Sequence, residues 1–203
     1  MQAEKSPYEL LEEANKPTPL SRTFSFWTTS SGGKGRLTRE DYEKDNKLLG
    51  NISTVEEFWT FYQHMVRPDK LPTGGKFCLF QEGIHPSWED KENDGGSSFI
   101  LKVKKNYANK FWEELLISYI GEQCEENDQI CGLLLNVKEA EVVISVWMKP
   151  VDQETREYIA SWIKQTLGLN ERTTFQFKYH PKNRDDQPPY SHSHTHSHHQ
   201  GSQ

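Results

Sequence analysis

The spacing of apolar residues most constrains the fold, because segments with a period of two alternate along the chain with segments whose period is 3.6. Strands are expected at residues 23–29, 76–81, 98–103, 129–137, 141–147 and 173–179. Helices are expected at about 55–65, 108–121 and 152–167. Most of the connecting turns are too short for crossovers, so the strands should pair antiparallel. The expected fold class is α+β, a sheet covered by three helices.

Composition divides the chain into three parts. Residues 1–17 are charged and contain prolines, which predicts a flexible N-terminal arm. Residues 18–182 carry all six tryptophans and should form one domain. Residues 183–203 are rich in histidine and serine and are expected to be a disordered tail. A histidine-rich tract can chelate a metal, but a solvated end is the simpler interpretation, so we expect no metal site and no cofactor.

The cysteines and the charge exclude several function classes. The three cysteines are odd in number and lack zinc-finger spacing, which argues against a disulfide framework and a structural zinc. No stretch approaches the ~18 consecutive apolar residues of a membrane span, and the N-terminus has no signal-peptide layout. A cytosolic or nuclear location away from membranes is therefore expected. The net charge of −6 predicts that any contact with nucleic acid is local.

The first expected helix has two apolar stripes roughly 90° apart, which cannot easily face the same sheet. One stripe is Phe58, Phe61 and Met65, and the other is Val55, Trp59, Tyr62 and Val66. Trp59 therefore belongs either to the core or to a surface site for a partner helix. In the second helix Ile117 lies away from the apolar face, beside Glu113 and Glu114.

The loop after the strand at 76–81 contains the most unusual local sequence, in which Trp88 directly precedes Glu89 and Asp90. An aromatic ring beside a carboxylate suits a flat, cationic base, and guanine methylated at N7 has the charge and a donor edge for both carboxylate oxygens. Such a bidentate contact discriminates by about 1–3 kcal/mol. Stacking contributes about 1–3 kcal/mol per base, and a desolvated cation–π contact adds roughly 2 kcal/mol.

Four segments together resemble the mRNA cap-binding family of translation initiation factor 4E. They are residues 55–68, 79–90, 111–115 and 130–132, and the first ends in the His-Met-Val-Arg-Pro of the family's 4E-homologous-protein branch. The resemblance covers about residues 18–182. It implies a curved antiparallel eight-stranded sheet with three helices on its convex face and a 7-methylguanosine cap on the concave face.

The resemblance assigns the base-binding residues. Trp88 matches one stacking ring and Glu89 the carboxylate that reads guanine, while Trp147 matches the tryptophan that contacts the N7 methyl group. The second stacking ring falls at Tyr42, where mainstream factors have tryptophan. A tyrosine ring attracts a cation less strongly than tryptophan does, so cap affinity is expected to be lower than that of a general factor.

At the phosphate-binding positions the chain departs from the family. The two basic positions on the strands leading to the methyl-contacting tryptophan are Lys138 and Val143, so one charge is lost. Ser98 stands where mainstream factors have an arginine, and Lys102 on the same strand is a candidate substitute. Lys182 and Arg184, near the start of the tail, could supply further charge. Fewer basic contacts predict a shallow salt dependence of binding.

The resemblance also implies a docking groove for a helical partner peptide on the convex face. Its residues are Pro19, Leu20, Val55, Trp59, Glu113, Glu114 and Ile117. Glu113 replaces a leucine of mainstream factors, and a charge in an apolar groove disfavours partners that bury leucine there. The usual initiation scaffold is therefore expected to bind poorly.

The leading hypothesis is a monomeric cytoplasmic cap-binding protein that regulates translation, as a repressor or a specialised initiation factor; a nuclear or RNA-granule location stays open. The alternative is a general initiation factor that recruits the scaffold protein. A protein-interaction domain whose cap pocket has decayed is a third interpretation. An enzyme is not expected, because adjacent Glu89 and Asp90 point in different directions and no nucleophile with a base accompanies them.

Overall fold

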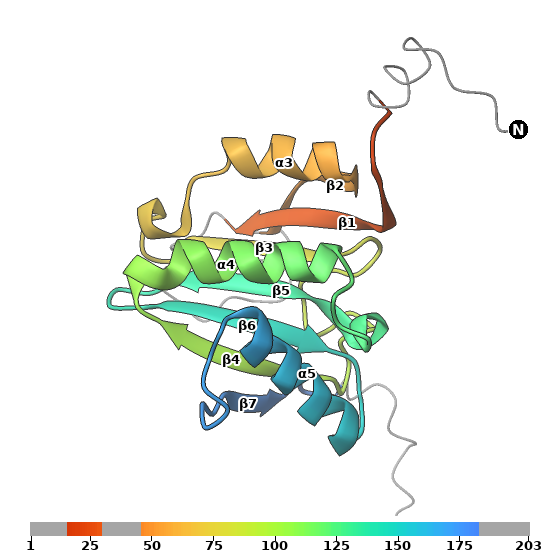
Figure 1. Ribbon diagram of the computed structural model, residues 1–203, viewed down its shortest axis with the longest axis vertical. Coiled ribbons are helices and arrows are strands. Elements are labelled where there is room, and N and C mark those ends of the chain that lie inside the picture. The colour runs from red at the N-terminus through yellow and green to blue at the C-terminus, as the bar shows by residue number, and fades with distance from the viewer. Residues whose placement is uncertain (1–15, 30–45, 183–203) are drawn as a thin grey trace, which may run out of the picture.

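The computed structural model describes residues 16–29 and 46–182, and its described strands form one antiparallel sheet in the order β2-β1-β3-β5-β6-β4-β7. The strands are β1 (Pro19–Thr29), β2 (Asn46–Thr54), β3 (Lys76–Gln81), β4 (Ser97–Val103), β5 (Ile130–Val137), β6 (Val142–Met148) and β7 (Gln176–Tyr179). The helices are α3 (Val55–His64), α4 (Lys105–Ile120) and α5 (Gln153–Thr166), with 3-10 turns at Pro68–Lys70 and Asn127–Gln129. All three lie over one face of the sheet (Figure 1).

Strand alternation divides the apolar residues between the two faces of the sheet. Phe77 and Leu79 of β3 point into the main core beneath the helices. Cys78 and Phe80 point the other way and are buried in a second, smaller cluster with Ile84 and Cys131. Three half-buried residues of that face pack against this cluster, namely Trp27, Leu134 and Trp147. The concave face therefore has its own apolar floor, which supports the candidate site.

Helix α3 begins where the sequence predicts. Thr54 is its N-cap, and its hydroxyl accepts a hydrogen bond from the Glu57 amide at 3.1 Å. The Glu57 carboxylate accepts in return from the Thr54 amide at 3.2 Å, which completes a capping box. The opening of β1 is tied to the same turn, because the Val55 amide donates to the Thr18 carbonyl at 2.9 Å.

The structure corrects the expected sheet in three places. The described residues form seven strands rather than eight. Strand β2 was not predicted, because it is an edge strand in which Leu48 and Leu49 are exposed and the apolar residues do not alternate cleanly. Strand β7 is shorter than the expected 173–179, because its ladder with β4 starts at the pair Gln176 and Ile100.

Two residues of the second apolar stripe of α3, Trp59 and Tyr62, lie in different environments. The Tyr62 ring is 2% exposed and stacks on that of Phe58, one helical turn away, with centroids 5.5 Å apart. Trp59 meets the Tyr62 ring edge-on at 6.0 Å and stays 36% exposed. The second stripe is therefore divided: Tyr62 belongs to the core and Trp59 to the surface.

Two expectations drawn from the sequence concern the cysteines and membrane-spanning segments. Cys78, Cys124 and Cys131 are free and buried. Within the described ranges, no helix is long and apolar enough to cross a lipid bilayer.

Candidate cap-binding site

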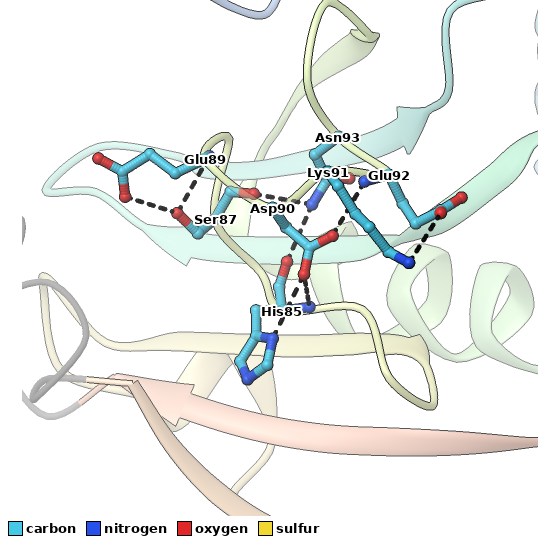
Figure 2. A network of polar contacts seen from close by, with 7 residues as sticks. All are labelled: His85, Ser87, Glu89, Asp90, Lys91, Glu92 and Asn93. Atoms are coloured by element: carbon cyan, nitrogen blue, oxygen red, sulfur yellow. Dashed lines mark hydrogen bonds and ion pairs between the residues drawn. The ribbon is translucent and has the colours of Figure 1, made fainter. Parts of the chain in front are cut away.

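The loop between β3 and β4 is held in shape by the buried side chain of Asn93 (Figure 2). Its Nδ2 donates to the carbonyl oxygens of His85 at 2.9 Å and Ser87 at 2.8 Å. Asp90 fixes the same loop from another side, since its carboxylate accepts from the amides of His85 at 2.9 Å and Glu92 at 3.0 Å. The backbone on both sides of Trp88 is therefore constrained before any ligand binds.

Trp88 and Glu89 stand at the outer end of this loop. Trp88 is 39% exposed, which is unusual for a ring of its size in a loop so firmly held. The Ser87 hydroxyl donates to Glu89 Oε2 at 3.1 Å, and the Glu89 amide lies 3.3 Å from the same hydroxyl oxygen. In Figure 2 the Glu89 carboxylate extends away from Asn93 and Asp90. An exposed ring and an oriented carboxylate are thus presented together.

Trp147 comes from β6, on the face of the sheet opposite the helices. Its ring meets Phe80 edge-on with centroids 5.7 Å apart. Gly132 pairs with Trp147 in the ladder, and a Cβ at Gly132 would come within 2.4 Å of the Phe80 ring. The missing side chain at Gly132 therefore leaves room for Phe80 to support Trp147.

His180, which the sequence did not single out, connects Trp147 to the loop. Its ring is 7% exposed and its centroid lies 4.4 Å from that of Trp147. Its Nδ1 is 3.1 Å from the Asn93 carbonyl oxygen, and its amide donates to the Gly96 carbonyl at 2.8 Å. Burial lowers the pKa of His180, which favours the neutral imidazole beside Trp147. Its position directly after a strand of alternating apolar residues was the available sequence signal.

The two lysines expected to bind phosphate, Lys102 and Lys138, lie along the sheet at a distance from Trp147. Lys102 is on the concave face in register with Val143 and forms an ion pair with Glu141 at 3.5 Å. Lys138 is exposed just after β5. Ser98 pairs with Trp147 in the ladder and is buried. Tyr42, the expected second stacking ring, lies outside the described residues.

On the helical side, the expected docking residues are exposed or half-buried. Trp59 and Ile117 are each 36% exposed. Val55 and Leu20 are half-buried, and Pro19 is exposed at the start of β1. Large apolar side chains are thus left at the surface of α3 and α4, as a docking surface requires.

Glu113 is held by residues at the end of α3. Its Oε2 lies 3.4 Å from Nη1 of Arg67, whose guanidinium stacks over the Tyr62 ring at 4.3 Å. Burial and the nearby Glu113 carboxylate raise the pKa of Tyr62, so the phenol stays protonated. Glu114 lies 3.6 Å from Lys110, one turn earlier in α4. Arg67 therefore partly neutralises the charge of Glu113 at the docking surface, and Lys110 does the same for Glu114.

The chain matches the family model described as Eukaryotic initiation factor 4E over residues 19–195. It belongs to this family. Members of the 4E family are translation initiation factors rather than enzymes, and the α+β fold expected from the sequence is confirmed.

Named relatives match most of the chain. The translation initiation factor NCBP of rice is 35% identical over 173 residues, which are 85% of this chain and 75% of that protein. Translation initiation factor 4E-4 of Caenorhabditis elegans is 30% identical over 174 residues, 85% of this chain and 81% of that protein.

A solved structure with the same fold is C. elegans eIF4E-3 in complex with the 4E-binding protein Mextli and a cap analog. It has a TM-score of 0.75 and 28% identity, covering 81% of this chain and 94% of that chain. A schistosome eIF4E in complex with m7GpppA and 4E-BP has a TM-score of 0.72 and 29% identity, covering 80% and 88%.

Proposed function

We propose that this 4E-family protein binds the 7-methylguanosine cap of mRNA on the concave face of its sheet. The observation that carries the proposal is the exposed Trp88 ring, set beside the oriented Glu89 carboxylate on a loop that Asn93 holds rigid. The complexes of related factors with cap analogs support the same use of this fold.

Each residue has a separate task in this proposal. Trp88 and Tyr42 stack on the two faces of the methylated guanine, where cation–π attraction favours the methylated base. Glu89 accepts hydrogen bonds from N1–H and the 2-amino group, which reads guanine. Trp147 contacts the methyl group, and Lys138 and Lys102 attract the phosphates.

Retention on a 7-methylguanosine resin tests this assignment. Trp88→Ala removes a stacking ring and should abolish retention, and Glu89→Gln should also do so because the amide cannot accept two parallel donors. Tyr158→Ala, which removes an exposed aromatic side chain from helix α5 on the other face of the sheet, is the matched control. Retention of the Trp88 and Glu89 variants at the wild-type level would show that these residues do not form the site.

We infer further that the protein is a regulator of the 4E-homologous-protein type, a repressor or a specialised initiation factor. The reason is Glu113: a partner that buries a leucine against α4 must desolvate this carboxylate and its contact with Arg67. A general factor that recruits the initiation scaffold through Pro19, Leu20, Val55, Trp59 and Ile117 remains the alternative.

The affinity of a helical scaffold peptide separates the two. Glu113→Leu should tighten binding about tenfold, equal to roughly 1.4 kcal/mol. Glu154→Leu, an equivalent exchange at an exposed position of α5, should leave the affinity unchanged. Wild-type binding as tight as that of a mainstream factor would refute the regulatory role.

The remaining assignments concern organisation. We propose a monomeric working unit of residues 18–182, with residues 1–17 as an arm and 183–203 as a tail. Its working compartment is the cytoplasm, where its translation factor relatives act, and a nuclear or granule pool would be additional.

A further inference from the structure

Strand β7 places a basic side chain beside the candidate cap pocket. In the ladder Trp147 pairs with Ser98, and Ser98 pairs with Lys178. Residues directly opposite each other in neighbouring strands share one face of the sheet. Since neighbouring strands are about 4.8 Å apart, the Lys178 backbone lies roughly 10 Å from that of Trp147, within reach of a lysine side chain and a ligand between them.

The chain stays beside the Trp88 loop past the end of β7, because the His180 amide donates to the Gly96 carbonyl at 2.8 Å. His180 follows Lys178 by two residues and packs on Trp147. Lys182 follows by two more, and its aliphatic stem crosses Gly95, where a Cβ would lie 3.1 Å from Lys182 Cε. Lys178 and Lys182 therefore flank His180 along the border of the Trp88 loop.

The charges of these two lysines are not neutralised by the described residues. Among residues 16–29 and 46–182, neither lysine forms an ion pair, whereas Lys102 pairs with Glu141 at 3.5 Å and Lys149 with Glu92 at 3.3 Å. The charge on Lys178 is close enough to His180 to contribute to the lowered pKa of its ring. Two unpaired ammonium groups on an otherwise acidic protein favour an anionic ligand at this border.

We propose that Lys178 and Lys182 bind the phosphate chain attached to the methylated base. This inference rests on the proposed cap function and adds a phosphate contact at the edge of the sheet to those proposed for Lys138 and Lys102. Lys102 is four residues from Ser98 along β4, roughly 13 Å at the usual strand rise, so it is farther from Trp147 than Lys178 is. Lys178 and Lys182 supply positive charge that the chain lacks at Ser98, where mainstream factors have an arginine.

The test compares 7-methylguanosine with its 5′-triphosphate, with binding followed by tryptophan fluorescence. Lys178→Ala should weaken triphosphate binding about tenfold, as expected for one desolvated charge contact of roughly 1.4 kcal/mol, and leave nucleoside binding unchanged. The slope of log affinity against log salt should fall by about one. Lys182→Ala should act in the same direction, and Lys178→Arg should retain both properties.

Lys110→Ala is the matched control, because Lys110 is an exposed lysine on α4, over the opposite face of the sheet. Equal ratios of triphosphate to nucleoside affinity in the wild type, Lys178→Ala and Lys110→Ala would overturn the inference while leaving the cap site intact. Wild-type protein that binds neither ligand would refute the cap function, and this inference with it.

Discussion

Replacing Asn93 with alanine should loosen the loop that presents Trp88 and Glu89. The Asn93 side chain is 0% exposed and donates two hydrogen bonds, at 2.9 Å to the His85 carbonyl and 2.8 Å to the Ser87 carbonyl. A hydrogen bond contributes about 1 kcal/mol net. Both carbonyls keep a second donor without Asn93, the Ser87 amide at 2.7 Å from the His85 oxygen and the Asp90 amide at 3.2 Å from the Ser87 oxygen, so neither is left unpaired. The alanine variant should therefore lose about 2 kcal/mol of the free energy that holds this loop in shape.

Two measurements separate the part of this loss that lowers global stability from the part that opens the loop locally. Urea unfolding reports the part that lowers global stability, and titration with 7-methylguanosine triphosphate reports the part that opens the loop locally. An opened loop lowers the apparent affinity by the fraction of molecules still closed, and 2 kcal/mol corresponds to about thirtyfold.

Asn127→Ala provides the matched control for this experiment. Asn127 is also buried, but neither polar atom of its side chain has a hydrogen-bond partner among the described residues, so its loss should cost little. If Asn93→Ala and Asn127→Ala differ neither in unfolding free energy nor in cap affinity, Asn93 does not hold the loop.

Three further predictions follow from the packing. Burial lowers the pKa of the His180 imidazole, so below about pH 6.5 the unfolded chain binds a proton that the folded protein does not bind. The free energy of unfolding should therefore decline as the pH falls from about 6.5 through the folded pKa, and His180→Asn should flatten this part of a plot of urea midpoint against pH. Gly132→Ala should lower the unfolding free energy by about 1–3 kcal/mol, measured by urea denaturation, because its Cβ would meet the Phe80 ring at 2.4 Å; wild-type stability would contradict this. Trp59→Ala should weaken binding of a helical 4E-binding peptide at least tenfold in a pull-down titration, and unchanged binding would exclude Trp59 from the docking surface.

Local signals were sufficient for most of the fold. The helix expected at 55–65 is found at Val55–His64, because a capping box and acidic first-turn residues can be read within four positions of sequence. The strand expected at 76–81 matches Lys76–Gln81, since both faces of this central strand are apolar. Trp88 drew attention by its local sequence, because it directly precedes two carboxylates, whereas Trp147 was assigned only through the family resemblance. The roles of both residues stay predictions.

What could not be predicted depends on contacts between distant segments. Asn93 and His180 are 87 residues apart, and their hydrogen bond exists only once β7 has joined the sheet edge. Strand β2 is stabilised by pairing with β1 rather than by its own pattern. Tyr62 could be placed in the core only when the packing of α3 against the sheet was known.

We propose that the concave face recognises a guanine by the positive charge that methylation at N7 gives the base. Tryptophan fluorescence titrations with 7-methylguanosine triphosphate and with unmethylated guanosine triphosphate test it directly. Desolvated cation–π attraction of about 2 kcal/mol predicts an affinity for the methylated nucleotide higher by at least tenfold. Equal affinities for the two nucleotides would show that the site does not recognise the charge of the methylated base.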